Sequence, residues 1–145
     1  MNPQIRKLES KDIDRVYDLG MKVSEFSARD KAEHRFWPKE TLERFADQGL
    51  SFVIEDQSLV VGFLLSAYQL ITQKLTWENM YIDPNYQKRG LAEKCFKECW
   101  DEAQRKGASM MEGIVASDNL PSQKMLTRLG FNSAGNYQWM LKFKE

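Results

Sequence analysis

The segment "DPNYQKRGLAEKCFKE", residues 83–98, decides which fold we expect for the second half of the chain. It follows the apolar stretch "WENMYI" (77–82), which predicts a strand, and it continues into apolar residues at helical spacing. Gly90 removes a side chain where that helix would begin, and the polar triplet 87–89 adds donors and positive charge. Because a helix N-terminus presents unpaired N–H groups, the junction could hold a pyrophosphate, although a solvated turn would use similar residues.

Hydrophobic periodicity along the whole chain predicts a mixed α/β domain with the element order βααβββαβαβ. Strands are expected at residues 4–8, 51–56, 58–68, 74–83, 109–117 and 137–143. Helices are expected after Ser10 or Asp12, and at residues 38–49, 90–106 and 120–130. The three consecutive strands between residues 51 and 83 indicate an antiparallel meander. We expect a single domain over residues 1–145.

Composition narrows the classes of partner. The chain has 21 basic and 21 acidic residues, so no overall field attracts nucleic acid or an anionic membrane. Cys95 and Cys99 are four residues apart on one expected helix, without nearby further ligands, and are interpreted as core residues rather than a metal site. The N-terminus lacks an apolar signal region, and no apolar run approaches roughly 18 residues. A cytoplasmic protein without metal is the expectation.

The succession of strand, loop 83–92, long helix, strand and segment 119–131 resembles the Gcn5-related N-acetyltransferase superfamily. The resemblance covers about the second half of the chain and implies a mixed, mostly antiparallel central sheet flanked by helices. In that family a Q/R-x-x-G-x-G/A segment wraps the pyrophosphate of acetyl-coenzyme A. Here this segment consists of Gln87, Lys88, Arg89, Gly90, Leu91 and Ala92, with alanine at the commoner second glycine.

Two further parts of the coenzyme site follow from the same resemblance. The family strand that ends like Ile82-Asp83-Pro84 pairs through its backbone with the pantetheine arm, which implies contacts at Met80, Tyr81 and Ile82. The family's N-x-x-A/S motif, followed by a G-F ending, is matched by Asn119, Ser122 and Gly130-Phe131.

The chemistry requires a group that removes a proton from the attacking amine. Glu78 is the first candidate, because the family often keeps a carboxylate on this strand and burial beside Trp77 would raise its pKa. Glu112, on the next strand, is the second candidate, and His34, the only histidine, is the third. Each of these side chains could instead be structural or solvated.

The proton donor to the departing thiolate is less defined. The family's usual tyrosine corresponds to Leu126, which leaves Tyr81, Tyr137 or solvent for this role. The backbone N–H of Met80 could polarise the thioester carbonyl. Phe26, Phe36 and Trp37 either line the acceptor pocket or belong to the core.

The sequence therefore predicts an acetyl-coenzyme A-dependent N-acetyltransferase that modifies a primary amine of a small molecule or of a peptide or protein. The alternative is a non-catalytic acyl-coenzyme A sensor or interaction module of the same fold, for which Leu126 is the best argument. A nucleotide-binding domain would need a Walker-type lysine that the chain lacks. The acceptor and the oligomeric state, including a homodimer, are left open.

Overall fold

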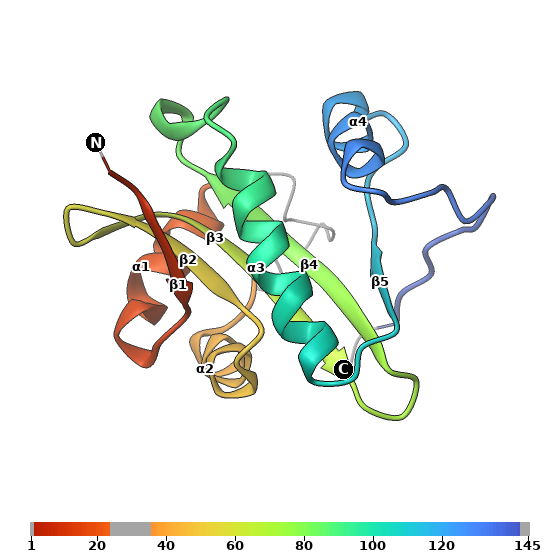
Figure 1. Cartoon of the computed structure of the whole chain (residues 1–145), viewed down its shortest axis with the longest axis horizontal. Helices are drawn as coiled ribbons and strands as arrows, with labels where there is room; N and C mark the ends of the chain where they lie inside the picture. Colours follow the sequence, from red (N-terminus) through yellow and green to blue (C-terminus); the bar gives the residue numbers. More distant parts are fainter. Residues whose placement is uncertain (1, 24–35, 143–145) are drawn as a thin grey trace. The chain divides into compact units, whose positions relative to one another are not determined.

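The computed structural model describes residues 2–23 and 36–142, which form two compact units, Met1–Ile114 and Val115–Glu145. The first unit contains a five-stranded sheet and the second contains one helix (Figure 1). The candidate site residues between 78 and 92 belong to the first unit, and those between 119 and 137 belong to the second.

The sheet has the strand order β1-β2-β3-β4-β5. Its strands are β1 (Gln4–Lys7), β2 (Phe52–Asp56), β3 (Leu59–Gln69), β4 (Lys74–Ile82) and β5 (Met110–Gly113). The pairs from β1 to β4 are antiparallel, and β4 pairs with β5 in parallel. This confirms a mixed, mostly antiparallel sheet and the meander expected between residues 51 and 83.

Helices cover both faces of the sheet (Figure 1). Helices α1 (Ile13–Met21) and α2 (Lys39–Gln48) pack on one face, and α3 (Leu91–Arg105) packs on the other. Short 3-10 turns, η1 (Ser10–Asp12) and η4 (Pro84–Tyr86), precede α1 and α3. The helix ends agree with the expected ends, because Pro38 is the N-cap of α2 and Gly49, with φ 76°, is its C-cap.

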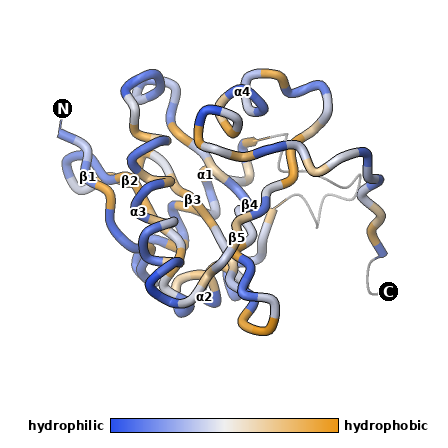
Figure 2. Tube along the Cα trace, turned by 45° about the vertical axis from the view of Figure 1, so that its right-hand side comes forward, coloured by the Kyte–Doolittle hydropathy of each residue, from blue (hydrophilic) through white to orange (hydrophobic). Residues whose placement is uncertain are grey.

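The core lies on both sides of β3, the middle strand. Residues 60–66 of β3 are all buried, and the central strands β2 and β3 are largely hydrophobic along the trace (Figure 2). On the α1 and α2 face, Phe36 packs on Phe63 with ring centroids 5.9 Å apart. A Cβ atom at Gly20 would collide with the Phe36 ring, so the glycine allows α1 to approach this aromatic layer.

The second unit contains α4 (Leu120–Arg128), followed by residues 131–142 without regular secondary structure. The strand expected at 137–143 is therefore wrong over the described part of that range. Alternating apolar residues form a strand only where another strand satisfies their backbone groups, whereas Tyr137 and Met140 are more than four-fifths exposed. The strand expected at 109–117 ends at Gly113, where its pairing with β4 ends.

An ion-pair network joins β1 to η1 and β2. The guanidinium of Arg6 donates two 2.8 Å hydrogen bonds to the carboxylate of Asp12 and further bonds to Glu55. Asp12 is buried and also accepts a hydrogen bond from the backbone N–H of Glu9 at 2.9 Å. Burial alone would raise the pKa of Asp12, but the bonds from Arg6 and Glu9 lower it below its ordinary value.

We expect Asp12→Asn to lower the free energy of unfolding at neutral pH by about 1 to 3 kcal/mol, because Arg6 and the Glu9 N–H lose a charged partner. A lowered pKa stabilises the fold above the ordinary pKa of the carboxyl, and this contribution is lost as the pH falls through the lowered value. Urea unfolding should therefore show a difference that shrinks in acid.

The control is Glu102→Gln, which should change stability little, because both partners of Glu102 are exposed: Lys7 is 48% exposed and Arg105 is 63% exposed. A destabilisation by Asp12→Asn that is equal at neutral and acidic pH would contradict this account of the network.

Candidate active site

The edge of β4 is open beyond its pairing with β5. Pairing between these strands runs from Lys74 opposite Met110 to Trp77 opposite Gly113. On its other side, β4 stays paired with β3 as far as Ile82. Residues 78–82 therefore have no strand on the β5 side within the part of the chain that the structure describes.

Backbone groups of β4 point into this open edge. The N–H of Asp83 donates to the carbonyl of Val61 on β3 at 2.8 Å. Because backbone groups alternate along a strand, those of Ile82 and Met80 point away from β3. An extended chain could pair with such an edge through main-chain hydrogen bonds.

A β-bulge in β4 lies at the start of the open edge. Leu65 pairs with Asn79 and Ser66 pairs with Trp77, so Glu78 between them has no counterpart on β3. The bulge changes the faces of the side chains, since Trp77 stacks on Phe96 of α3 while Asn79 bonds to Trp37 on the opposite side. Bulges redirect side chains in this way and often lie beside active sites.

The two candidate bases have different surroundings. Glu112 forms an ion pair with the Lys74 ammonium at 3.1 Å and accepts a hydrogen bond from the Thr76 hydroxyl at 3.4 Å. Glu78 has no hydrogen-bond or ion-pair partner among the residues 2–23 and 36–142. Although Glu78 is exposed as a whole residue, partial desolvation raises the pKa of its carboxyl, and the negative charge of Glu112 adds to this increase.

The loop before α3 leaves the helix N-terminus open. Gly90 is the N-cap with φ 76°, and it makes no side-chain capping bond. A Cβ atom at Gly90 would meet no atom within 4 Å, so an approaching group finds free space there. Leu91 turns into the core, and Ala92 adds little bulk at the first turn. The first N–H groups of α3 thus remain available to an anion.

The polar residues of the loop are already oriented. The amide of Gln87 donates to the carbonyl of Ile82 at 2.8 Å, which ties the loop to the open strand edge. The guanidinium of Arg89 lies over the ring of Tyr86, 5.6 Å from its centroid. Lys88 is exposed and has a positive φ of 61°. The structure thus brings the strand residues 80–82 and the loop residues 87–92 into one continuous surface.

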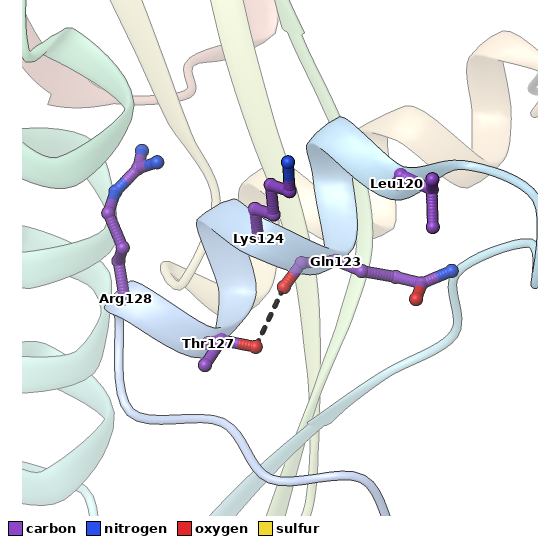
Figure 3. A pocket seen from close by; sticks show the side chains of 5 residues that line it. All are labelled: Leu120, Gln123, Lys124, Thr127 and Arg128. Atoms are coloured by element: carbon purple, nitrogen blue, oxygen red, sulfur yellow. Dashed lines mark hydrogen bonds between the residues drawn. The ribbon is translucent and has the colours of Figure 1, made fainter.

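The remaining predicted residues lie in the second unit. Asn119 is the N-cap of α4, and its side-chain oxygen accepts a hydrogen bond from the N–H of Ser122 at 3.3 Å. Leu126 is partly buried, and Tyr137 is 82% exposed. A pocket on α4 is lined by Leu120, Gln123, Lys124, Thr127 and Arg128 (Figure 3).

The aromatic candidates divide between core and site. Phe36 is a core residue, whereas Trp37 is partly exposed and donates its indole N–H to the Asn79 side chain at 2.7 Å. The ring of Tyr81 packs on Phe63, and burial raises the pKa of its phenol, so the hydroxyl stays protonated at neutral pH. Phe26 and His34 lie outside the described residues.

The described residues contain no group of three or more histidine, cysteine or acidic side chains that could hold a metal ion. Cys95 and Cys99 are buried on α3, and burial raises the pKa of the Cys99 thiol to about 11. No described helix is both long and apolar enough to cross a membrane.

An open strand edge leads into an uncapped helix N-terminus, and a carboxylate of raised pKa lies on the same strand, an arrangement that marks this part of the sheet as the candidate active site. Residues 13–131 match the model of the acetyltransferase (GNAT) family, and the chain belongs to this family. It is thus an N-acetyltransferase, as its resemblance to the superfamily implied.

The chain is 24% identical over 133 residues to the [ribosomal protein bS18]-alanine N-acetyltransferase of Escherichia coli (strain K12), covering 90% of this chain and 81% of that one. Its fold is similar to that of AAC(6')-Iy in complex with a bisubstrate analogue, with a TM-score of 0.77 and 16% identity. The alignment covers 99% of this chain and 100% of that chain. It is also similar to the PaiA N-acetyltransferase from Thermoplasma acidophilum in complex with coenzyme A, with a TM-score of 0.76, 18% identity and 91% coverage of both chains.

Proposed function

We propose that this enzyme transfers the acetyl group of acetyl-coenzyme A to a primary amine of a small molecule or of a peptide or protein. The observation that carries the proposal is the continuous surface from the open edge of β4 to the uncapped N-terminus of α3. An extended amide-containing arm suits the strand edge, and a pyrophosphate suits the helix terminus. Among the similar proteins, one acetylates an alanine of a ribosomal protein and another was solved with an acetylneamine bisubstrate analogue, which supports an amine as the acceptor class.

The residues of the chain fit the coenzyme at each end. The backbone of Met80 and Ile82 faces the edge, while Gly90 and Ala92 leave room around the first N–H groups of α3. Lys88 and Arg89 bring positive charge to the same turn. Asn119 and Ser122, at the start of α4, are proposed to contact the coenzyme, as the resemblance to the family's N-x-x-A/S motif implies.

Glu78 is proposed as the general base. Its carboxylate takes a proton from the acceptor amine, directly or through water, as the new C–N bond forms and the C–S bond breaks. The N–H of Met80 donates to the carbonyl oxygen of the thioester. Tyr81 holds a proton at neutral pH and, with Tyr137 and solvent, is a candidate to return one to the departing sulfur. Glu112 is less suited as a base, because Lys74 neutralises it.

A substitution at Gly90 tests the coenzyme site. We expect Gly90→Glu to abolish the binding of coenzyme A in calorimetry, since a carboxylate would repel phosphate at the helix N-terminus. The left-handed φ of 76° strains any side chain at this position, but the new Cβ meets no atom within 4 Å, so the fold should persist with reduced stability. The matched control is Gly107→Glu, which introduces the same residue at φ 102° just after the other end of α3 and should retain binding. If Gly90→Glu binds as tightly as the parent, the pyrophosphate assignment is wrong.

A substitution at Glu78 tests the base. Glu78→Gln should lower kcat by about ten- to a thousand-fold and leave coenzyme affinity nearly unchanged. In the parent the rate should fall as the pH drops through the raised pKa of Glu78, because the protonated carboxyl cannot accept a proton. Glu78→Gln should remove this acidic limb.

The control for this experiment is Glu112→Gln, which should retain turnover and move the acidic limb to lower pH, since it removes the like charge that raises the pKa of Glu78. A thiol-release assay with a panel of amines provides the rates. Unchanged turnover in Glu78→Gln would transfer the role to another group, and a parent that binds coenzyme A but acetylates no amine would favour the acyl-coenzyme A sensor.

A further inference from the structure

Tyr86 connects the coenzyme loop to a distant buried carboxylate. Its hydroxyl donates a 2.6 Å hydrogen bond to Asp56, the last residue of β2, which is 30 positions earlier in the chain. This length is typical of a bond from a hydroxyl to a charged acceptor. The other oxygen of Asp56 accepts the backbone N–H of Asn2 at 3.1 Å. Asp56 is only 5% exposed, so the residues packed around it, rather than contact with solvent, fix the position of its carboxylate.

The ring of Tyr86 has two further contacts. One is with the hydrophobic cluster of Ile54, Val61 and Leu91, which lies beneath the loop and includes the first residue of α3. The other is with the guanidinium of Arg89, which lies over the ring. A phenol whose hydroxyl donates a hydrogen bond to a carboxylate has a more electron-rich ring, and such a ring attracts a cation more strongly. Asp56 therefore helps to hold Arg89 through Tyr86.

The backbone between Tyr86 and α3 needs such an anchor. Arg89 stands between two residues in the left-handed region, Lys88 with φ 61° and Gly90 with φ 76°. A non-glycine residue in this region is strained and persists only where its surroundings impose it. The hydrogen bond of Tyr86 to Asp56 and that of Gln87 to Ile82 fix the chain directly before this turn.

We infer that Tyr86 is a positioning residue for the pyrophosphate loop: its bond to Asp56 and its ring beneath Arg89 hold residues 87–92 in the binding conformation before coenzyme arrives. The inference rests on the proposed function, which places pyrophosphate at this loop. A loop that is already ordered loses less conformational entropy on binding, so the contacts should contribute to affinity. They should do so only for ligands that carry the pyrophosphate.

The test compares two probes on the full chain: coenzyme A, and S-acetylpantetheine, which has the same pantetheine arm with an acetylated thiol but lacks the phosphate-bearing nucleotide. We expect Tyr86→Phe to raise the Kd of coenzyme A in calorimetry by about three- to ten-fold, the effect of one lost hydrogen bond to a charged group that is partly transmitted to the site. The kcat/KM for S-acetylpantetheine should change less than about two-fold. In an Arg89→Ala background, the effect of Tyr86→Phe on coenzyme A should shrink, because both changes act through one contact.

The matched control is Tyr17→Phe. Tyr17 lies on α1 and also has a cation over its ring, the ammonium of Lys39 at 5.2 Å. Loss of this hydroxyl should affect neither probe. Should Tyr86→Phe fail to fold, Asp56→Asn serves as the second variant, since its amide oxygen can still accept from Tyr86 while the charge is gone. It should weaken coenzyme A binding by a smaller factor and again spare S-acetylpantetheine.

The outcomes separate the inference from the proposed function. Two results together support both the inference and the proposed function: the parent binds coenzyme A more tightly than S-acetylpantetheine, and Tyr86→Phe weakens only the binding of coenzyme A. The inference alone is overturned if the parent has this preference but a folded Tyr86→Phe, or Asp56→Asn in its place, binds coenzyme A normally. It is also overturned if that variant loses affinity for both probes equally. A parent without the preference overturns the pyrophosphate assignment, and the inference falls with it.

Discussion

The end of pairing between β4 and β5 is the constraint on which the rest of the site depends. Main-chain N–H and C=O groups of a strand need partners, and beyond Trp77 those on one side of β4 have none in the described sheet. An unpaired edge is normally a hazard for aggregation. Here it is short, it begins at the bulge of Glu78, and it leads directly into the loop before α3. The end of pairing with β5 thus leaves the proposed binding edge open, and the bulge opposite β3 redirects the proposed base.

The surroundings hold this interrupted strand in place from both faces. On one face Trp37 bonds to Asn79, directly after the bulge, and packs on Phe45 of α2. On the other face Trp77 stacks on Phe96 of α3. The loop is held by Tyr86 and Gln87, which bond to Asp56 and to Ile82. An open edge can remain ordered without its ligand when side chains on either side of it are fixed in this way.

Local signals in the sequence were sufficient to predict the helices and most of the strands. Helix α3 was predicted within one residue at each end, because Gly90 and Gly107 mark its limits and its apolar residues follow the 3.6-residue period. The expected strand at 137–143 shows the limit of such signals, because an alternating pattern does not reveal whether a partner strand is present. The proposed site residues on β4 and in the loop were predicted mainly through the family motif.

Features that depend on distant residues could not be predicted. The bulge at Glu78 is a matter of register between β3 and β4, and neither strand alone contains a signal for it. The same holds for the bond between Trp37 and Asn79, 42 positions apart, and for the bond between Tyr86 and Asp56. The sequence already placed Glu78 before Glu112 as candidate base, but the ion pair between Lys74 and Glu112, which supports this order, became apparent only from the structure.

The central claim is that the open edge of β4 and the first turn of α3 form one coenzyme surface. Titration of the ¹⁵N-labelled protein with coenzyme A, followed by amide chemical shifts, tests it most directly. The account predicts that the largest saturable shifts occur at Met80, Ile82 and residues 90–93, with smaller shifts on β1 and α2. Saturable shifts confined to other parts of the chain, with these amides unaffected, would contradict it.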